Sequence, residues 1–320
     1  MPEGHTVHRL GYAFAELFGG TQLQVSSPQG RFAAGAALLD GRVLAATEAH
    51  GKHLFLGFAA PADLADVRWL RVHLGLYGSW TFDGDETFHA PHAIGAPRRR
   101  VAEEEVAAPL PAGAEESDAA GTDGGGPQAP GSNGVWHPPA PRGAVRVRLL
   151  GDNGVADLTG PTACEVVTAE EKDEVHARLG PDPLRPDGDE AAFVAGVRAR
   201  RRAVGELLMD QAVIAGVGNI YRAEALYRAR LHPLRLGRDV PAARLRRVWQ
   251  DLAELMADGV ATGRIVTTRP EDRQEEDDRW YVYQRSGRPC LVCGTKVAEA
   301  LMQGRRLFWC PRCQRAPRRS

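Results

Sequence analysis

Two Cys-x-x-Cys motifs near the C-terminus restrict the fold more than any other feature of the sequence. Cys290 and Cys293 are followed, after sixteen intervening residues, by Cys310 and Cys313. Four thiolates at this spacing are typical of a tetrahedral zinc ribbon, in which the metal rigidifies a hairpin too short to fold alone. Because sulfur would fill all four positions around Zn²⁺, we expect one structural zinc ion and no metal-activated water.

The rest of the composition favours a globular protein of two domains. The chain has 320 residues, of which 43% are hydrophobic, enough to bury real cores. Its longest apolar runs fall well short of the ~20 residues that a membrane-spanning helix needs, and its start lacks the pattern of a secretory signal. We therefore expect a cytoplasmic protein that does not enter a membrane, and we expect it to be a monomer.

Charge is distributed unevenly along the chain. The net charge is −1, but seven acids and no Lys or Arg lie between Val101 and Pro141, which leaves +6 for the remainder. From Arg279 to Ser320 ten basic residues face only Glu299. Such a basic tail predicts a surface that binds the phosphates of nucleic acid, and a tail that only confers solubility is the alternative.

The first residues, Met1-Pro2-Glu3-Gly4, carry a possible nucleophile. Removal of Met1 would leave Pro2 with a free secondary amine, whose pKa near 7.7–8.0 keeps roughly a tenth of it neutral at pH 7. Addition of this amine to an aldehyde gives a cationic iminium, which promotes elimination at the adjacent carbon. Glu3 could move the protons. The alternative is an ordinary disordered terminus.

The first half of the chain predicts an antiparallel β-sandwich with flanking helices. Apolar residues at three-to-four spacing predict a first helix, capped by Thr6 and ended by Gly19-Gly20, which places Glu3 near a helix N-terminus. Residues 97–142 are rich in Pro, Gly and acids and predict a disordered insertion. The strand-like runs on either side of it are Leu23–Val25, Val43–Thr47, His53–Phe58, Trp69–Leu74, Ser79–Phe82, Val145–Leu150 and Val155–Leu158.

The second half is helical until the cysteine motifs. Caps are expected near Thr168, Asp189 and Ala203, and a last amphipathic helix spans about Ala242 to Ala257. In between, Gly216-Val217-Gly218-Asn219 opens a helix, where backbone N–H groups and the Asn219 amide can converge on a phosphate. The alternative is that this turn only connects two helices. The whole is a multi-domain α+β protein, in which 1–167 and 168–278 are the two larger predicted domains and 279–320 is the zinc-binding hairpin.

Three further segments place basic or large apolar side chains at predicted turns or strand entries. Lys52 follows Gly51 at the entry of a predicted strand, although a surface lysine is the simpler interpretation. Leu76-Tyr77 lies on a tight turn, from which large side chains can wedge between bases or pack back under their own hairpin. Arg305 lies in the loop between the two cysteine motifs, and on a hairpin fixed by the metal its guanidinium could reach a backbone phosphate.

Together these motifs resemble the formamidopyrimidine-DNA glycosylase/endonuclease VIII family of base-excision repair enzymes. The resemblance covers nearly the whole chain apart from the insertion. It implies a two-lobed enzyme with damaged double-stranded DNA in its cleft, a helix-two-turn-helix domain, and both glycosylase and lyase activity. The matching segments are Met1–Gly4, Gly51-Lys52, Asp210-Gln211, Ala215–Glu224 and Val282–Cys290.

The resemblance also implies individual roles. Pro2 resembles the Schiff-base nucleophile, and Glu3 the acid/base that opens the sugar. Lys52, Asn219 and Arg305 resemble the three phosphate ligands, of which the lysine is linked with β-elimination and the arginine with δ-elimination. The flipped-out base would be replaced by Pro2 at the sugar, and elimination would then cut the strand.

Other residues bear on the choice of lesion and on DNA contact. Gly4 and the pair Leu76-Tyr77 resemble the endonuclease VIII branch, which favours oxidised pyrimidines, while Arg222 and Arg306 are further predicted DNA contacts. An oxidised-purine glycosylase on the same scaffold is one alternative. A non-catalytic zinc-ribbon DNA-binding protein is another.

Overall fold

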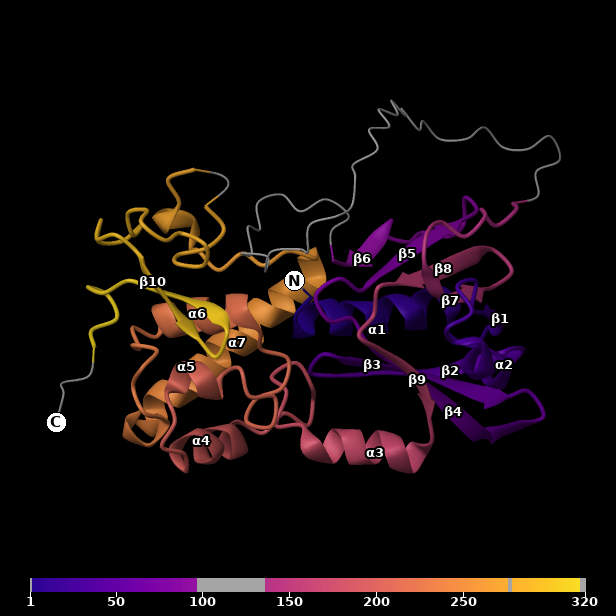
Figure 1. Cartoon of the computed structure of the whole chain (residues 1–320), viewed down its shortest axis with the longest axis horizontal. Coiled ribbons are helices and arrows are strands. Elements are labelled where there is room, and N and C mark those ends of the chain that lie inside the picture. Colours follow the sequence, from indigo (N-terminus) through magenta and orange to yellow (C-terminus); the bar gives the residue numbers. More distant parts are fainter. Residues whose placement is uncertain (1, 97–135, 276–277, 317–320) are drawn as a thin grey trace, which may run out of the picture.

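The protein consists of a sheet-rich lobe and a helical lobe that lie side by side. The computed structural model describes residues 2–96, 136–275 and 278–316. Strands from the first half of the chain form one lobe, and helices from the second half form the other, with a C-terminal hairpin over the helical lobe (Figure 1). The predicted α+β architecture is confirmed.

Strands of the first lobe build one antiparallel sheet, whose members are β1 Gln22–Ser26, β2 Arg42–His50, β3 His53–Ala60, β4 Asp63–His73, β5 Ser79–Gly84, β6 Ala93–Gly95, β7 Val145–Leu150, β8 Gly154–Thr159 and β9 Ala163–Val167. Their order is β6-β5-β8-β7-β1-β2-β3-β4-β9. The start of β1 pairs with β2 and its end with β7, so β1 joins two halves of the sheet. Apolar side chains from both halves share one core, as the predicted sandwich requires.

Helix α1, Gly4–Phe18, lies between the two halves of the sheet, and its start is at the junction of the lobes (Figure 1). Its buried face follows the predicted spacing, and the Phe14 ring contacts Trp80 of β5 at 4.8 Å between centroids. The predicted cap at Thr6 is wrong, because the extended residue Glu3 holds the N-cap position and Thr6 lies in the first turn. The Glu3 side chain makes no capping bond to α1 because it is used elsewhere.

Helices dominate the second half of the chain. The first, α3 Ala169–Arg178, packs against β4 of the sheet. The second lobe contains α4 Glu190–Arg198, α5 Val204–Leu207, α6 Asn219–Arg228 and α7 Ala242–Thr262, with short 3₁₀ turns η1 Gly237–Asp239 and η2 Pro270–Asp272. Thr168 forms a capping box with Glu171, and Asp189 caps α4, as the sequence predicts. A helix also begins after Ala203, as the sequence predicts, and it ends at Leu207. The last helix runs beyond Ala257 and stops at Gly263, which adopts a left-handed conformation.

The C-terminal hairpin consists of β10, Ala298–Met302, and β11, Arg305–Trp309, and β11 packs against α6. Most of the predicted insertion, residues 97–135, lies outside the described residues. Its last part, 136–142, contains no helix or strand, and the Pro139 carbonyl accepts a hydrogen bond from Arg148 at 2.7 Å. Among the described residues, no helix is long and apolar enough to cross a membrane.

Candidate active site

Glu3 is fully buried at the contact between the lobes, and its carboxylate binds the start of α6. The two oxygens accept hydrogen bonds from the backbone N–H groups of Gly218 at 2.9 Å, Ile220 at 2.8 Å and Tyr221 at 3.4 Å. A helix N-terminus favours an anion because its first N–H groups lack partners and its dipole is positive. The expected anion at this helix was a phosphate, but in the structure these N–H groups bind Glu3.

Glycine is required at this contact for space. A Cβ atom at Gly218 would lie 2.3 Å from the Glu3 carboxyl carbon. The loop before α6 is also close to the N-terminal segment, since the N–H of Gly4 donates to the Gly216 carbonyl at 2.8 Å. Gly216 has a φ of 88°, in the left-handed region that favours glycine. A larger residue at position 218 would push Glu3 away from α6, while a non-glycine residue at position 216 would be strained by the positive φ. The Gly216-Val217-Gly218 turn, which the sequence predicts to bind an anion, therefore provides the space in which the Pro2–Glu3 segment packs. Pro2 itself is buried.

Lys52 lies in the turn between β2 and β3, facing the same region. Gly51, with a φ of 60°, brings this turn against Ala215 and Gly216 of the helical lobe. Burial lowers the pKa of Lys52; the Glu3 carboxylate acts in the opposite direction, and Arg305 of β11 lowers the pKa further. Among the described residues, the Lys52 ammonium forms no ion pair. Three predicted site residues thus come from three distant segments and influence one another electrostatically.

Asn219 is the first residue of α6, and its side chain contacts the hairpin. Its Nδ2 donates to the Arg306 carbonyl at 3.1 Å, while its Oδ1 accepts from Arg222 Nη2. Arg222 also donates to the Arg306 carbonyl, at 2.8 Å. The Arg306 guanidinium forms an ion pair with Glu299 at 2.6 Å. The backbone of Arg306, more than its charge, is therefore what joins the hairpin to α6.

Arg222 differs from the surface position expected for a DNA contact. Its side chain is only 1% exposed, and its Nε has no hydrogen-bond partner. Burial, followed by the nearby charge of Arg305, lowers the pKa of Arg222 to about 10. The structure places Arg222 beneath the surface, where it orients the Asn219 amide, so a direct DNA contact by Arg222 stays a prediction.

Leu76 and Tyr77 project from the turn between β4 and β5. Their exposed fractions are 37% and 62%, so neither side chain packs fully under its own hairpin. The turn is closed by a hydrogen bond from the Gly78 N–H to the Leu74 carbonyl at 2.9 Å. Both side chains therefore lie at the surface of the sheet-rich lobe.

Glu224, in the middle of α6, is a site residue that sequence reasoning missed. It is fully buried and accepts hydrogen bonds from the N–H groups of Tyr281, Val282 and Tyr283 at 2.8–2.9 Å, and from the Thr267 hydroxyl. Burial raises the pKa of Glu224, while these four donors oppose that rise. The carboxylate ties α6 to the segment that leads into the cysteine motifs. The only signal in the sequence is an acid among apolar neighbours of a helix.

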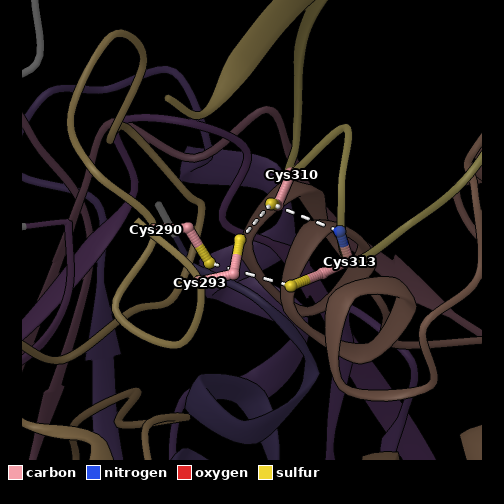
Figure 2. A group of neighbouring side chains, drawn as sticks. All are labelled: Cys290, Cys293, Cys310 and Cys313. Atoms are coloured by element: carbon pink, nitrogen blue, oxygen red, sulfur yellow. Dashed lines mark hydrogen bonds between the residues drawn. The ribbon is translucent and has the colours of Figure 1, made fainter. Parts of the chain in front are cut away.

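The four cysteines of the two motifs converge on one point (Figure 2). All four Sγ atoms lie within 4.8 Å of one another, with 3.5 Å between Cys293 and Cys310 and 4.0 Å between Cys290 and Cys313. A tetrahedron of Zn–S bonds near 2.3 Å has sulfur atoms about 3.8 Å apart. The side chains present therefore fit a four-thiolate zinc ion. The Tyr227 hydroxyl, 3.1 Å from the Cys290 sulfur, connects this group to α6.

Replacement of one ligand tests whether a metal stabilises the hairpin. We expect Cys310→Ser to lower zinc content and to lower the thermal unfolding temperature, because the hairpin has little core of its own. Cys164→Ser, at the cysteine outside the cluster, is the matched control and should keep the full metal content. Metal analysis and thermal unfolding of both variants measure the effect. Equal zinc content in the two variants would contradict the assignment.

Known proteins resemble this chain over nearly its whole length. Two family models match, the formamidopyrimidine-DNA glycosylase N-terminal domain over residues 1–106 and the formamidopyrimidine-DNA glycosylase H2TH domain over residues 179–270. Endonuclease 8 1 of Mycobacterium tuberculosis is 41% identical over 320 residues, covering 98% of this chain and 100% of that protein. Formamidopyrimidine-DNA glycosylase of Salinispora arenicola is 42% identical over 149 residues, which cover 45% of this chain and 52% of that protein.

Solved structures show the same fold. The MutM (Fpg) protein from Thermus thermophilus superposes with a TM-score of 0.66 at 25% identity, covering 98% of both chains. The Lactococcus lactis Fpg in complex with abasic-site DNA superposes with a TM-score of 0.68 at 16% identity, covering 98% of this chain and 100% of that one. The full-length match to endonuclease 8, together with the two domain matches, shows that the chain belongs to the formamidopyrimidine-DNA glycosylase/endonuclease 8 family.

Proposed function

We propose that this chain is a bifunctional DNA glycosylase/AP lyase that removes oxidised pyrimidines from double-stranded DNA and then cuts the strand. The observation that supports this most strongly is the buried Glu3 carboxylate, which three N–H groups hold directly beside Pro2. A carboxylate fixed in this way lies next to a nucleophile and can serve as its acid/base partner. Family membership supports the same reaction class.

In the proposed reaction, the Pro2 nitrogen attacks the sugar carbon that carries the damaged base. The bond between sugar and base breaks, and the base leaves with the electron pair and is protonated by water. The Glu3 carboxylate takes the proton that the Pro2 nitrogen loses and passes it to the ring oxygen, so that the sugar ring opens and an iminium links Pro2 to the sugar. The cationic iminium acidifies the neighbouring C–H bond. Loss of that proton expels the 3′ phosphate, and a second elimination expels the 5′ phosphate.

Lys52, Asn219 and Arg305 are the proposed phosphate ligands. Burial lowers the pKa of Lys52 more than the Glu3 carboxylate raises it, so a phosphate beside Lys52 would stabilise the ammonium. The Asn219 Nδ2 group donates to the Arg306 carbonyl in the free protein, and we propose that it exchanges this acceptor for a phosphate oxygen. The zinc ion, when bound to its four cysteines, would supply rigidity to the hairpin that carries Arg305.

Replacement of Arg305 separates the two eliminations. We expect Arg305→Ala to leave base excision and the first cut within about threefold of wild type, but to accumulate the product of β-elimination, because a cation that assists the second leaving phosphate is lost. Gel analysis of cleaved abasic-site DNA measures the ratio of the two products. Arg312→Ala, in the zinc-binding turn, serves as the control. An unchanged product ratio in Arg305→Ala would contradict the assignment.

The preferred lesion is tested by direct comparison. The resemblance of Gly4 and Leu76-Tyr77 to the endonuclease VIII branch, together with the full-length similarity to endonuclease 8, favours oxidised pyrimidines. We expect excision of 5-hydroxycytosine and thymine glycol to exceed that of 8-oxoguanine by about tenfold or more in matched duplexes, since such ratios need only a few kcal/mol. Faster removal of 8-oxoguanine would support the purine alternative. The non-catalytic alternative predicts that none of these three damaged bases is removed.

A further inference from the structure

Asp182 lies in the segment between α3 and α4 and contacts the two parts of the site at once. Its side chain is 1% exposed. Oδ2 accepts hydrogen bonds from His8 Nε2 of α1 at 2.9 Å and from the Gly51 N–H at 2.7 Å, while Oδ1 accepts from the Leu184 N–H at 2.9 Å. One carboxylate oxygen therefore joins the helix that follows Pro2 and Glu3 to the residue that precedes Lys52.

The backbone around Asp182 extends this junction to the other lobe. The Gly180 carbonyl accepts from His50 Nε2 at 3.0 Å, and the Gly180 N–H donates to the Gln211 carbonyl at 2.8 Å. The Pro181 carbonyl accepts from the Ala215 N–H at 3.0 Å. Residues 180–182 thus bind the strand end before Lys52 on one side and the loop before α6 on the other.

We propose that Asp182 is a positioning residue, which sets the distance between the Pro2–Glu3 pair and Lys52 by holding α1 and the Lys52 turn on one carboxylate oxygen. The inference rests on the proposed function. Asp182 contacts no reacting atom in this arrangement, so its effect is exerted through the geometry of the groups it holds.

The physical basis is the cost of leaving buried donors without an acceptor. Without the carboxylate, the N–H groups of Gly51 and Leu184 and the His8 ring would lose their shared acceptor in a site closed to water. The turn would then shift to find other partners. Because a displacement of about 1 Å in a catalytic group can lower a rate about 10²-fold, a small movement of Lys52 relative to Pro2 is enough to be measured.

The experiment follows strand cleavage of an abasic-site duplex under single-turnover conditions. Asp182→Ala, Asp182→Asn and the control Asp187→Asn are each made with native Lys52 and with Lys52→Ala. Asp187 lies on the same segment, and its exposed carboxylate forms an ion pair with Arg185. Thermal unfolding of every variant reports folding, and His8→Gln perturbs the same junction from α1 should Asp182→Ala fail to fold.

We expect Asp182→Ala to lower the maximal rate about 10²-fold, with the enzyme concentration for half-maximal rate changed by less than about threefold. Asp182→Asn should retain an intermediate rate, because its amide oxygen can still accept from Gly51. In the Lys52→Ala background the effect of Asp182→Ala should shrink to less than about threefold, since the group it positions is already absent.

Two results would overturn the inference. An Asp182→Ala enzyme as fast as wild type would show that the junction does not control the site. Equal losses in both backgrounds would show that Asp182 acts on the fold in general. Failure of the wild-type protein to cleave abasic DNA would instead refute the proposed function, so the two failures are distinguished.

Discussion

An N-terminally extended form of the protein, in which an extra residue stays in amide linkage to Pro2, is expected to lose covalent trapping on abasic-site DNA. The loss should exceed about 10³-fold, as is usual when a covalent nucleophile is removed. The reason is that an amide nitrogen shares its electron pair with the adjacent carbonyl, whereas a terminal proline nitrogen keeps it. Borohydride, which reduces the iminium to a stable amine, converts the intermediate into a DNA-linked protein band on a denaturing gel.

The matched control carries the same extension followed by a protease site that restores Pro2 as the first residue. Cleavage should return trapping to the level of the unextended protein. Binding to a duplex with a non-cleavable abasic analogue distinguishes loss of chemistry from loss of binding. Trapping of the extended form at the native rate would show that another amine, such as Lys52, is the nucleophile.

Glu3→Gln is expected to have the second-largest effect and to act on two levels. Excision of an oxidised base should fall by about 10²-fold or more, because an amide cannot give or take the proton at the sugar. The free energy of unfolding should fall by about 1–3 kcal/mol, because the amide NH₂ of glutamine would face backbone N–H groups whose hydrogen bonds the carboxylate now accepts. Glu16→Gln, on the exposed face of the same helix, should change neither quantity.

Single-turnover excision and denaturant unfolding of the two variants provide the measurements. The fall in stability separates the structural part of the Glu3 effect, which comes from its bonds to α6, from the chemical part. If Glu3→Gln were as active as wild type, Glu3 would serve only as the anion that caps α6.

Local signals in the sequence predicted most of the architecture. Alternating apolar residues indicated the main strands, Thr168 and Asp189 marked real helix starts, and the cysteine spacing predicted a cluster that the structure confirms. Each of these signals is contained within a few residues. The short elements α2 (Ala33–Leu39), β6 and β9 were missed because they have neither caps nor a clear apolar period and depend on their neighbours.

The long-range contacts of the site were not predictable in the same way. The sequence placed Glu3 near the start of a helix, but the helix that binds its carboxylate is α6, more than two hundred residues away. Asp182 and Glu224 were missed because most of the donors that they bind lie in other segments. An acid among the apolar neighbours of a helix, the one local signal for Glu224, is too weak to identify such a residue without the fold.

The central claim is that the nitrogen of Pro2 forms the covalent bond to the damaged sugar. The most direct test is peptide mapping by mass spectrometry of the borohydride-reduced complex with abasic-site DNA, after digestion of both protein and DNA. We predict that the peptide beginning at Pro2, with Met1 removed, carries the mass of the reduced sugar fragment on its terminal nitrogen. A sugar fragment on Lys52, or on a peptide that still begins with Met1, would contradict this account.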